Sequence, residues 1–376
     1  MQLRNAMKRF NHKPLKNVAG LFLGLVLCSS LANAAEPINP NWEQEANELI
    51  NTPMIISWQN NGRLSKIQLI KLEDGQLTFQ VEGQPGEAAM PLDTIGDVVF
   101  QFETAKGFNQ AIGEVGEETF NAQYLDTIRK TAYPMAKFVN IPAKHANFVS
   151  IVRQFMDGLI QMEQLDEALY LVKEINAPSL GPSYEETTLT LGKTFLEDGS
   201  LDRTIEILDM VNIEEINLSN STLVFDVAHI LRGQEKYEEA INIYKKLSKN
   251  KEITNHEAEF WAYYCALKQG QHFDNHTFVK DVKKIEPSEP GFPLQQLVIG
   301  TYFTNREQHF DAMRAISEGI AYATPVEEWT PELMYRSAVA YQNVDMNDIS
   351  VAVLKETVLF FPSSSWATAA NEILEN

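Results

Sequence analysis

The stretch Tyr-Glu-Glu-Ala-Ile-Asn-Ile-Tyr at residues 237–244 decides the fold class of this 376-residue chain. Its apolar side chains recur at intervals of three and four residues, which predicts an amphipathic helix. Similar helix openings stand 36 residues earlier at 201–204 (Leu-Asp-Arg-Thr) and 72 residues earlier at 165–168 (Leu-Asp-Glu-Ala). A constant period of this length predicts an array of helical hairpins.

Residues 146–376 divide into six units on this period. One position of the second helix recurs in steps of 36 residues, with a last step of 38: Ala168, Thr204, Ala240, His276, Ala312 and Ser350. Where the two helices cross, the first helix holds mostly small residues: Met156, Gly192, Ala228, Tyr264, Gly300 and Ala338. A large apolar residue follows three places later: Leu159, Phe195, Leu231, Leu267, Phe303 and Tyr341. A small residue beside a large one is what close helix packing requires.

This pattern resembles the tetratricopeptide repeat over residues 146–376. Leu191-Gly192 with Phe195, and the stretch at 237–244, match that repeat best. The unit that starts at 257 departs from it, with His276 in place of a small residue and Lys280 in place of an aromatic one, so we expect this hairpin to pack differently. The resemblance implies a right-handed superhelix whose first helices line a concave groove. Repeats of this family usually bind peptides or proteins and rarely carry catalysis.

A period of two residues replaces the helical period in residues 51–104. Apolar and polar residues alternate over 76–82, and Asn-Gly at 61–62 and Asp-Gly at 74–75 mark hairpin turns. The apolar spacing slips between 64 and 72, which predicts a β-bulge. Five strands this short must close on themselves to bury one face, so we predict a small β-barrel similar to the Sm-like and SH3-like barrels.

The predicted fold is therefore α+β and mainly α. A short helical lead-in at 36–50 precedes the five-stranded β-barrel at 51–104. A helical connector and cap at 105–145 leads into the right-handed helical-hairpin superhelix at 146–376. Because repeats contact only their neighbours, we expect a chain that begins near residue 105 to fold without the barrel and to be strongly helical.

The first 35 residues have the composition of a cleavable signal peptide. Basic residues precede an apolar stretch, and Ala-Asn-Ala-Ala at 32–35 supplies the small residues that a signal peptidase requires. The alternative is a membrane anchor, but the apolar run from Val18 to Leu27 is short for a span, which needs roughly 20 residues. We expect cleavage near Ala34 or Ala35, a periplasmic or secreted protein, and no stable membrane insertion afterwards.

The two cysteines of the sequence help to predict the cellular compartment of the protein. Leu27 precedes Cys28 where a lipoprotein signal has a small residue, which argues against lipidation. Cys265 is the one cysteine left after cleavage, so no internal disulfide can form. A lone apolar-flanked cysteine reads as buried and inert, and it fits a bacterial periplasm better than a eukaryotic secretory route.

The charge balance argues against nucleic acid as a partner. The chain has a net charge of −20, and removal of five basic residues with the signal leaves 26 Lys and Arg against 51 Asp and Glu, a net charge of −25. Residues 51–104 hold Arg63, Lys66 and Lys71 against seven acidic residues, whereas a phosphate-tracking groove needs the opposite balance.

Two readings of the function remain open. One is a scaffold or adaptor in the cell envelope that holds a peptide or protein in the repeat groove. The alternative is a glycan- or nucleic-acid-binding module that acts through the barrel, with the repeats as a spacer. Glycan binding would call for exposed aromatic residues on one barrel face, and Trp58 is the single tryptophan in that region.

The sequence carries none of the common motifs for catalysis or cofactor binding. The sequence has no phosphate-binding glycine loop, no His-Glu-x-x-His, no cysteine pair and no Gly-x-Ser-x-Gly. His272 and His276 stand four apart with Asp274 between them, but without a third positioned ligand such a pair is normally structural or solvated. We therefore expect a protein that is not an enzyme, with no catalytic residues, cofactor or metal.

The resemblance also implies which residues face the groove. The fifth, ninth and twelfth positions of the first helices give the candidate partner-binding set: Arg153, Lys193, Phe225, His229, Arg232, Trp261 and Lys268. Basic side chains along one groove would suit a peptide with acidic residues or a free C-terminal carboxylate, with Phe225 and Trp261 as anchors. In the alternative register, Phe225 and Trp261 belong to the core.

Overall fold

The computed structural model describes residues 40–60, 63–96, 98–253, 256–274 and 277–375. The described residues form two compact units, 40–253 and 256–375. The predicted signal peptide and His276 lie outside the described residues. No helix in the described ranges is long and apolar enough to cross a membrane. The fold is α+β and mainly helical, as the sequence predicts.

The first unit begins with a helix and a five-stranded antiparallel sheet. Helix α2 (Trp42–Ile50) precedes the sheet, whose strand order is β4-β3-β2-β1-β5. The strands are β1 (Met54–Asn60), β2 (Arg63–Glu73), β3 (Gln76–Val81), β4 (Ala88–Pro91) and β5 (Phe100–Phe102), with a short 3-10 helix η1 (Leu92–Thr94) before the last. A register shift between Leu69 and Lys71 confirms the predicted bulge in β2.

The prediction of a closed barrel is wrong, because the sheet is open. Strands β4 and β5 form its two opposite edges, and they have only four and three residues. The sheet does not close on itself, because its apolar face joins a continuous hydrophobic cluster with the helices that follow. Phe100 of β5 stacks on His145 with ring centroids 5.8 Å apart, and Phe102 lies 5.3 Å from Phe148.

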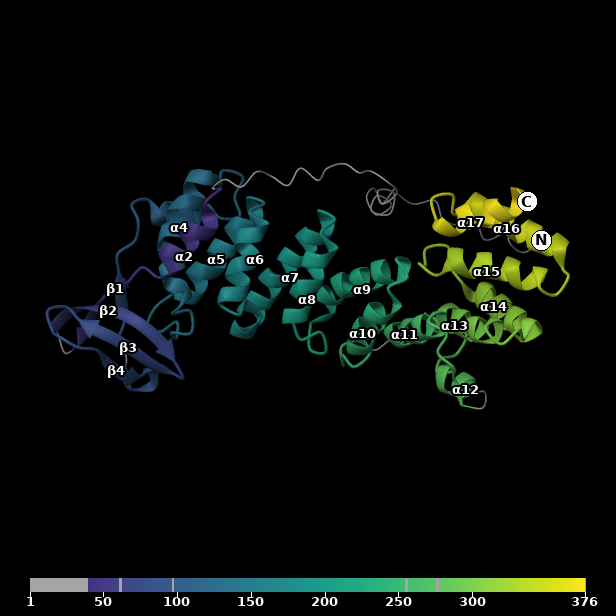
Figure 1. Cartoon of the computed structure of the whole chain (residues 1–376), viewed down its shortest axis with the longest axis horizontal. Helices are drawn as coiled ribbons and strands as arrows, with labels where there is room; N and C mark the ends of the chain where they lie inside the picture. The colour runs from purple at the N-terminus through teal and green to yellow at the C-terminus, as the bar shows by residue number, and fades with distance from the viewer. Residues whose placement is uncertain (1–39, 61–62, 97, 254–255, 275–276, 376) are drawn as a thin grey trace. The chain divides into compact units, whose positions relative to one another are not determined.

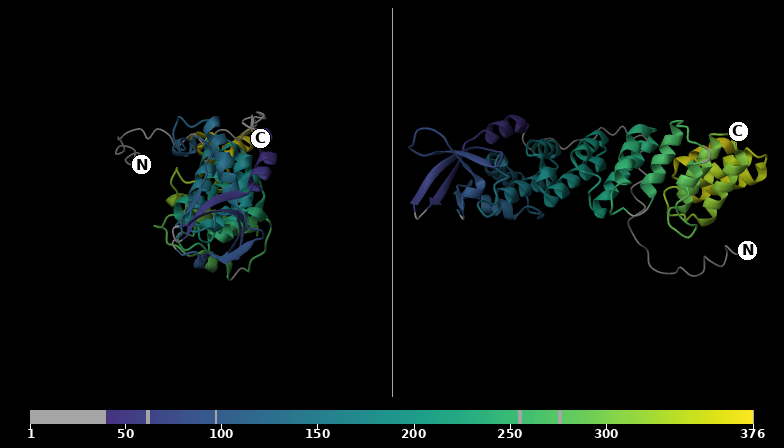
Figure 2. Two further views of the ribbon diagram at one scale, coloured as in Figure 1. Left: turned by 90° about the vertical axis from the view of Figure 1, so that its left-hand side faces the viewer. Right: turned by 90° about the horizontal axis from the view of Figure 1, so that it is seen from below.

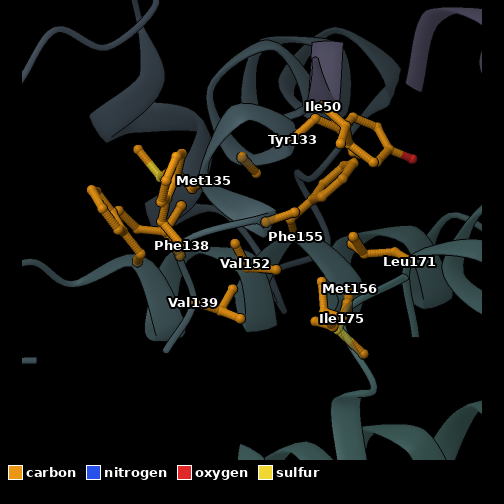
Figure 3. Close-up of a cluster of buried hydrophobic side chains, with 14 of the residues drawn as sticks. Ile50, Tyr133, Met135, Phe138, Val139, Val152, Phe155, Met156, Leu171 and Ile175 are labelled. Atoms are coloured by element: carbon orange, nitrogen blue, oxygen red, sulfur yellow. The ribbon is translucent and has the colours of Figure 1, made fainter. Parts of the chain in front are cut away.

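Two helices connect the sheet to the repeats. They are α3 (Phe108–Gly113) and α4 (Ala122–Ala136), in agreement with the predicted helical connector. Helix α2 packs beside α4 (Figure 1). Buried side chains from α2, α4, α5 and α6, including Ile50, Tyr133, Phe155 and Leu171, lie close to one another beneath this contact (Figure 3).

Helical hairpins make up the rest of both units. In the first unit they are α5 (Phe148–Gln161), α6 (Leu165–Glu174), a 3-10 turn η2 (Ala177–Leu180), α7 (Pro182–Glu197), α8 (Leu201–Met210), α9 (Leu218–Gly233) and α10 (Tyr237–Leu247). In the second they are α11 (Glu257–Lys268), α12 (Phe278–Val282), α13 (Phe292–Thr304), α14 (His309–Tyr322), α15 (Thr330–Gln342), α16 (Asn347–Phe360) and a last helix α17 (Ser365–Glu375). The right-hand view of Figure 2 shows the successive hairpins of the first unit, in teal to green.

The turn inside each hairpin has the same geometry. A residue with positive φ follows the first helix at Glu163, Gly199, Glu235, Gly270, Glu307 and Asp345, in steps of 36, 36, 35, 37 and 38 residues. The next amide donates back into the last turn of the first helix, as from Gln164 to the Leu159 carbonyl at 2.9 Å and from Lys236 to the Leu231 carbonyl at 2.9 Å. This is the Schellman arrangement of helix ends, and it confirms the predicted repeat period.

Burial agrees with the repeat alignment. The crossing positions Met156, Ala228 and Ala338 are fully buried. A β-carbon added at Gly192 would lie 3.0 Å from Ile207, and one added at Gly300 would overlap with Ile316, so glycine permits the close approach there. The hairpin that departs from the repeat pattern has only five residues in its second helix, α12, as its divergent sequence predicts.

Candidate partner-binding surface

The predicted groove residues fall in both units. The residues of the first unit are Arg153 on α5, Lys193 on α7, and Phe225, His229 and Arg232 on α9. Those of the second unit are Trp261 and Lys268 on α11. Within the first unit, α5 contacts α7 and α7 contacts α9.

Arg153 belongs to a polar network that joins two of these helices. Its guanidinium lies 3.0 Å from Asp157 Oδ2, and Thr187 Oγ1 of α7 donates to Asp157 Oδ1 at 2.9 Å. Burial raises the pKa of the Asp157 carboxyl above its ordinary value, while the Thr187 hydrogen bond and the charge of Arg153 offset part of that effect. Sequence reasoning missed Asp157 and Thr187, because their pairing depends on the contact between α5 and α7.

Lys193 also has an acidic neighbour one turn along its helix. Its Nζ lies 3.9 Å from Glu197 Oε1, and both side chains are more than half exposed. Arg153 and Lys193 therefore each lie beside a carboxylate four residues later. These carboxylates offset the positive potential that the predicted groove would have focused on α5 and α7.

An aromatic group lies on α9. Phe225 and His229 are both half-buried, and their rings stack with centroids 5.8 Å apart. His229 Nδ1 lies 2.6 Å from the hydroxyl of Tyr244, a buried residue of α10. Tyr244 thereby fixes the orientation of the His229 ring, and the Phe225 ring stays partly accessible beside it.

Trp261 lies in the core of its unit. It is fully buried, with its ring centroid 5.5 Å from that of Tyr264 and 6.5 Å from that of Trp329. It therefore offers no surface to a peptide, whereas Phe225 does. The two predicted anchors differ because α11 is apolar on nearly every side, so its sequence cannot distinguish a core aromatic from a surface one.

Lys268 lines a cavity of about 300 Å³ in the second unit. Lys268, at the end of α11, shares this cavity with His272 and with Arg306, which follows α13. Sequence reasoning missed Arg306, because it lies beyond the end of a first helix and aligns with no groove position.

Three features of the described residues bear on the alternative functions. No group of three or more His, Cys, Asp or Glu side chains in the described ranges is placed to hold a metal ion. Cys265 is fully buried. Trp58 is only 7% exposed and packs between Phe79 and Phe100, so it gives the sheet no open aromatic platform for a glycan.

Comparison with known proteins adds no assignment. No protein-family model and no curated protein matches this sequence.

Proposed function

We propose that this chain is an exported, non-catalytic scaffold of the tetratricopeptide-repeat type that binds a peptide or protein partner. The observation that supports the proposal is the contact of α5 with α7 and of α7 with α9, because first helices that pack side by side are what such a binding surface requires. The small crossing residues and the large apolar residues already fill the hairpin cores. Lys193 is exposed and Phe225 is half-buried, so both present surface to a partner.

The chemistry of this surface suits an extended segment of mixed polarity. Phe225, supported by the fixed ring of His229, offers a partly accessible aromatic anchor. The Arg153–Asp157 pair offers both donors and acceptors. Partly buried aromatic and Arg residues are the side chains that most often dominate protein interfaces.

A role in cell-envelope assembly or transport follows from the predicted signal peptide. The basic, apolar and small-residue order of residues 1–35 supports export, and an acidic surface keeps an exported protein soluble.

A capture experiment tests the proposal. The chain from residue 36 to 376 is immobilised and incubated with envelope extract, and the retained protein is then purified and titrated against the chain by calorimetry. Phe225→Ala should weaken that binding by about 2 kcal/mol, the size expected of an interface anchor. Phe310→Ala removes an aromatic ring that is 69% exposed on α14, and it serves as the matched control. Retention of only RNA or glycan would favour the alternative function and contradict this one.

A further inference from the structure

The outward face of helix α16 is rich in exposed apolar side chains. Four large apolar residues of this helix are exposed, namely Ile349, Val351, Leu359 and Phe360. Leu359 and Phe360 are the most open of them, at 72% and 58% exposure. Single apolar residues are common on protein surfaces, whereas a contiguous patch of them marks an interaction site.

The contacts of α16 within its own unit involve the opposite side of the helix. Helix α16 packs against α15 and α17. Its buried residues are Ser350, Leu354 and Thr357, and Val353 and Val358 pack partly against the small hydrophobic cluster of this hairpin. Within the described part of the chain, these neighbours leave the outward face of α16 accessible to solvent.

This face has a regular arrangement of charge. Residues four apart on a helix lie one above the other, so the outward face has two adjacent rows. The first row is Val351, Lys355 and Leu359, and the second is Ala352, Glu356 and Phe360, all exposed. Each row therefore has one charge between two apolar residues, and the two charges are opposite. No ion pair joins Lys355 or Glu356 to another described residue.

From these observations we infer that the two rows, here called the α16 face, bind the same face of a second copy of this chain. A two-fold dimer uses one surface on both copies, so that surface must be complementary to itself. If the two α16 helices run parallel about the two-fold axis, the first row of each copy faces the second row of the other. Lys355 then meets the partner's Glu356 twice, once on each side of the axis.

The antiparallel arrangement is disfavoured by the same geometry. It would place the first row against the first row, so that Lys355 of each copy would lie beside the same residue of the other. Like charges opposed across an interface cost free energy. The rows of residues four apart can also interdigitate with those of the second helix, which is the commonest way that two helices pack.

The charge of the whole chain favours a second copy as the occupant of this face. The chain has a net charge of −20, so two copies repel each other over most of their surfaces. Lys355 and Glu356 are the only charged residues between 349 and 360, which makes this apolar segment neutral. Two copies can meet here without like-charge repulsion. This inference goes beyond the proposed function and does not rest on it.

Sedimentation velocity over a concentration series tests the inference on the chain from residue 36 to 376. We expect a reversible dimer. Leu359→Gln with Phe360→Gln should raise its dissociation constant by at least about tenfold, because both copies lose the apolar contacts of the interface. Val99→Gln with Leu218→Gln is the matched control, since both residues are 60% exposed in the first unit, and it should leave the dissociation constant unchanged. Far-ultraviolet circular dichroism confirms that each variant is folded.

A charge reversal tests the pairing itself. Lys355→Glu and Glu356→Lys change the net charge in opposite directions, yet each should weaken the dimer by at least about tenfold, because each places like charges at both contacts. The two substitutions together restore unlike pairs and should recover the affinity. Lys245→Glu, at an exposed site on α10, makes the same change of net charge as Lys355→Glu and should have little effect.

Three results would overturn the inference. A chain that stays monomeric through the concentration series would leave the α16 face to a different protein. A dimer that is unaffected by the change at Leu359 and Phe360 would form through another surface. Failure of the double charge reversal to recover the affinity would contradict the parallel pairing. A partner that still binds a monomeric variant through Phe225 would leave the proposed function standing.

Discussion

Arg129 and Glu167 form a buried bidentate ion pair between α4 and α6. Arg129 Nε lies 2.8 Å from Glu167 Oε1, Nη2 lies 2.7 Å from Oε2, and both side chains are 1% exposed. Tyr133 donates a further hydrogen bond to Glu167 Oε1 at 3.0 Å. The pair therefore anchors the connector helix on the first repeat, with every carboxylate oxygen of Glu167 occupied.

Removing one member of this pair should be costly, because its partner then remains charged and buried. We expect Arg129→Met to lower the free energy of unfolding by about 3–5 kcal/mol in guanidinium titrations. Lys130→Met on the same helix is the matched control, since Lys130 pairs with Asp126 at 2.8 Å at an exposed site and should contribute only about 0–1 kcal/mol. Equal losses in the two variants would show that burial does not set the strength of this pair.

Gly300 should tolerate no β-carbon. An added methyl would overlap with Ile316 Cγ1, so Gly300→Ala should cost about 1–3 kcal/mol of stability through overpacking. The double variant with Ile316→Ala, which removes the clashing Cγ1 and Cδ1 atoms, should lose no more than about 2–5 kcal/mol, the cost of an ordinary buried Ile→Ala change. Gly233→Ala is the control, because nothing lies within 4 Å of its added methyl, and helix propensity should make it neutral or stabilising by up to about 1 kcal/mol. Thermal unfolding followed by circular dichroism measures all three.

The sequence predicts the contacts that recur in every repeat. Ala168, Ala240 and Ala312 recur at one spacing and are all buried, because the two helices of each hairpin pack against each other at this position. Contacts between unlike elements carry no such signal. Glu167 resembles the many solvated glutamates of the helices, and only the fold brings Arg129, 38 residues away, to its side.

The errors in the sheet and in the candidate site have similar causes. Alternation over β3 correctly indicates that one face is buried, but it does not say whether the sheet itself or a neighbouring helix covers that face. Trp261 and Phe225 hold equivalent repeat positions, yet their burial differs because the helices around them differ. Arg306 lines the same cavity as Lys268, beside the hydrogen bond from Asn305 to the Leu267 carbonyl, which no spacing in the sequence reports.

The pH dependence of stability should reveal the ion pair between Lys173 and Glu206. Lys173 Nζ lies 2.6 Å from Glu206 Oε1, and the hydrogen bond from Lys173 lowers the pKa of the Glu206 carboxyl below its ordinary value. A carboxyl whose pKa is lower in the folded state contributes stability above its unfolded pKa and loses it as the pH falls through the folded pKa. We expect Lys173→Met to cost about 0–1 kcal/mol near neutral pH, because the pair is partly exposed, and nothing at acidic pH.

A control substitution separates this effect from a general loss of charge. Lys245 is exposed on α10. The difference in the free energy of unfolding between Lys245→Met and the unsubstituted chain should not shrink in the same way as the pH falls. Chemical unfolding at a series of pH values gives both curves. A Lys173→Met difference that stays constant into the acidic range would contradict the assignment of Glu206 as the titrating partner.

Removal of the sheet should lower the stability of the first repeats, although their helices have clear amphipathic sequence patterns of their own. One hydrophobic cluster contains Ile56 of β1, Phe148 of α5 and Leu171 of α6, so the sheet and the first hairpin share a core. Helix α2 contributes as well, since Trp42 packs edge-on against Tyr170 with centroids 5.7 Å apart. A chain that begins at residue 105 loses all contacts of β1 and α2 while keeping the helices that they cover.

We therefore expect residues 105–376 to give a helical circular-dichroism spectrum, with a lower melting temperature and stronger binding of a hydrophobic dye than residues 36–376. The dye reports the apolar surface of α4, α5 and α6 that the deletion uncovers. A chain of residues 36–253 is the control, because it keeps the first compact unit complete and should retain the dye response of an intact core. If residues 105–376 melted at the temperature of the longer chain without binding dye, the sheet would be an independent domain and the shared core would contribute nothing to the repeats.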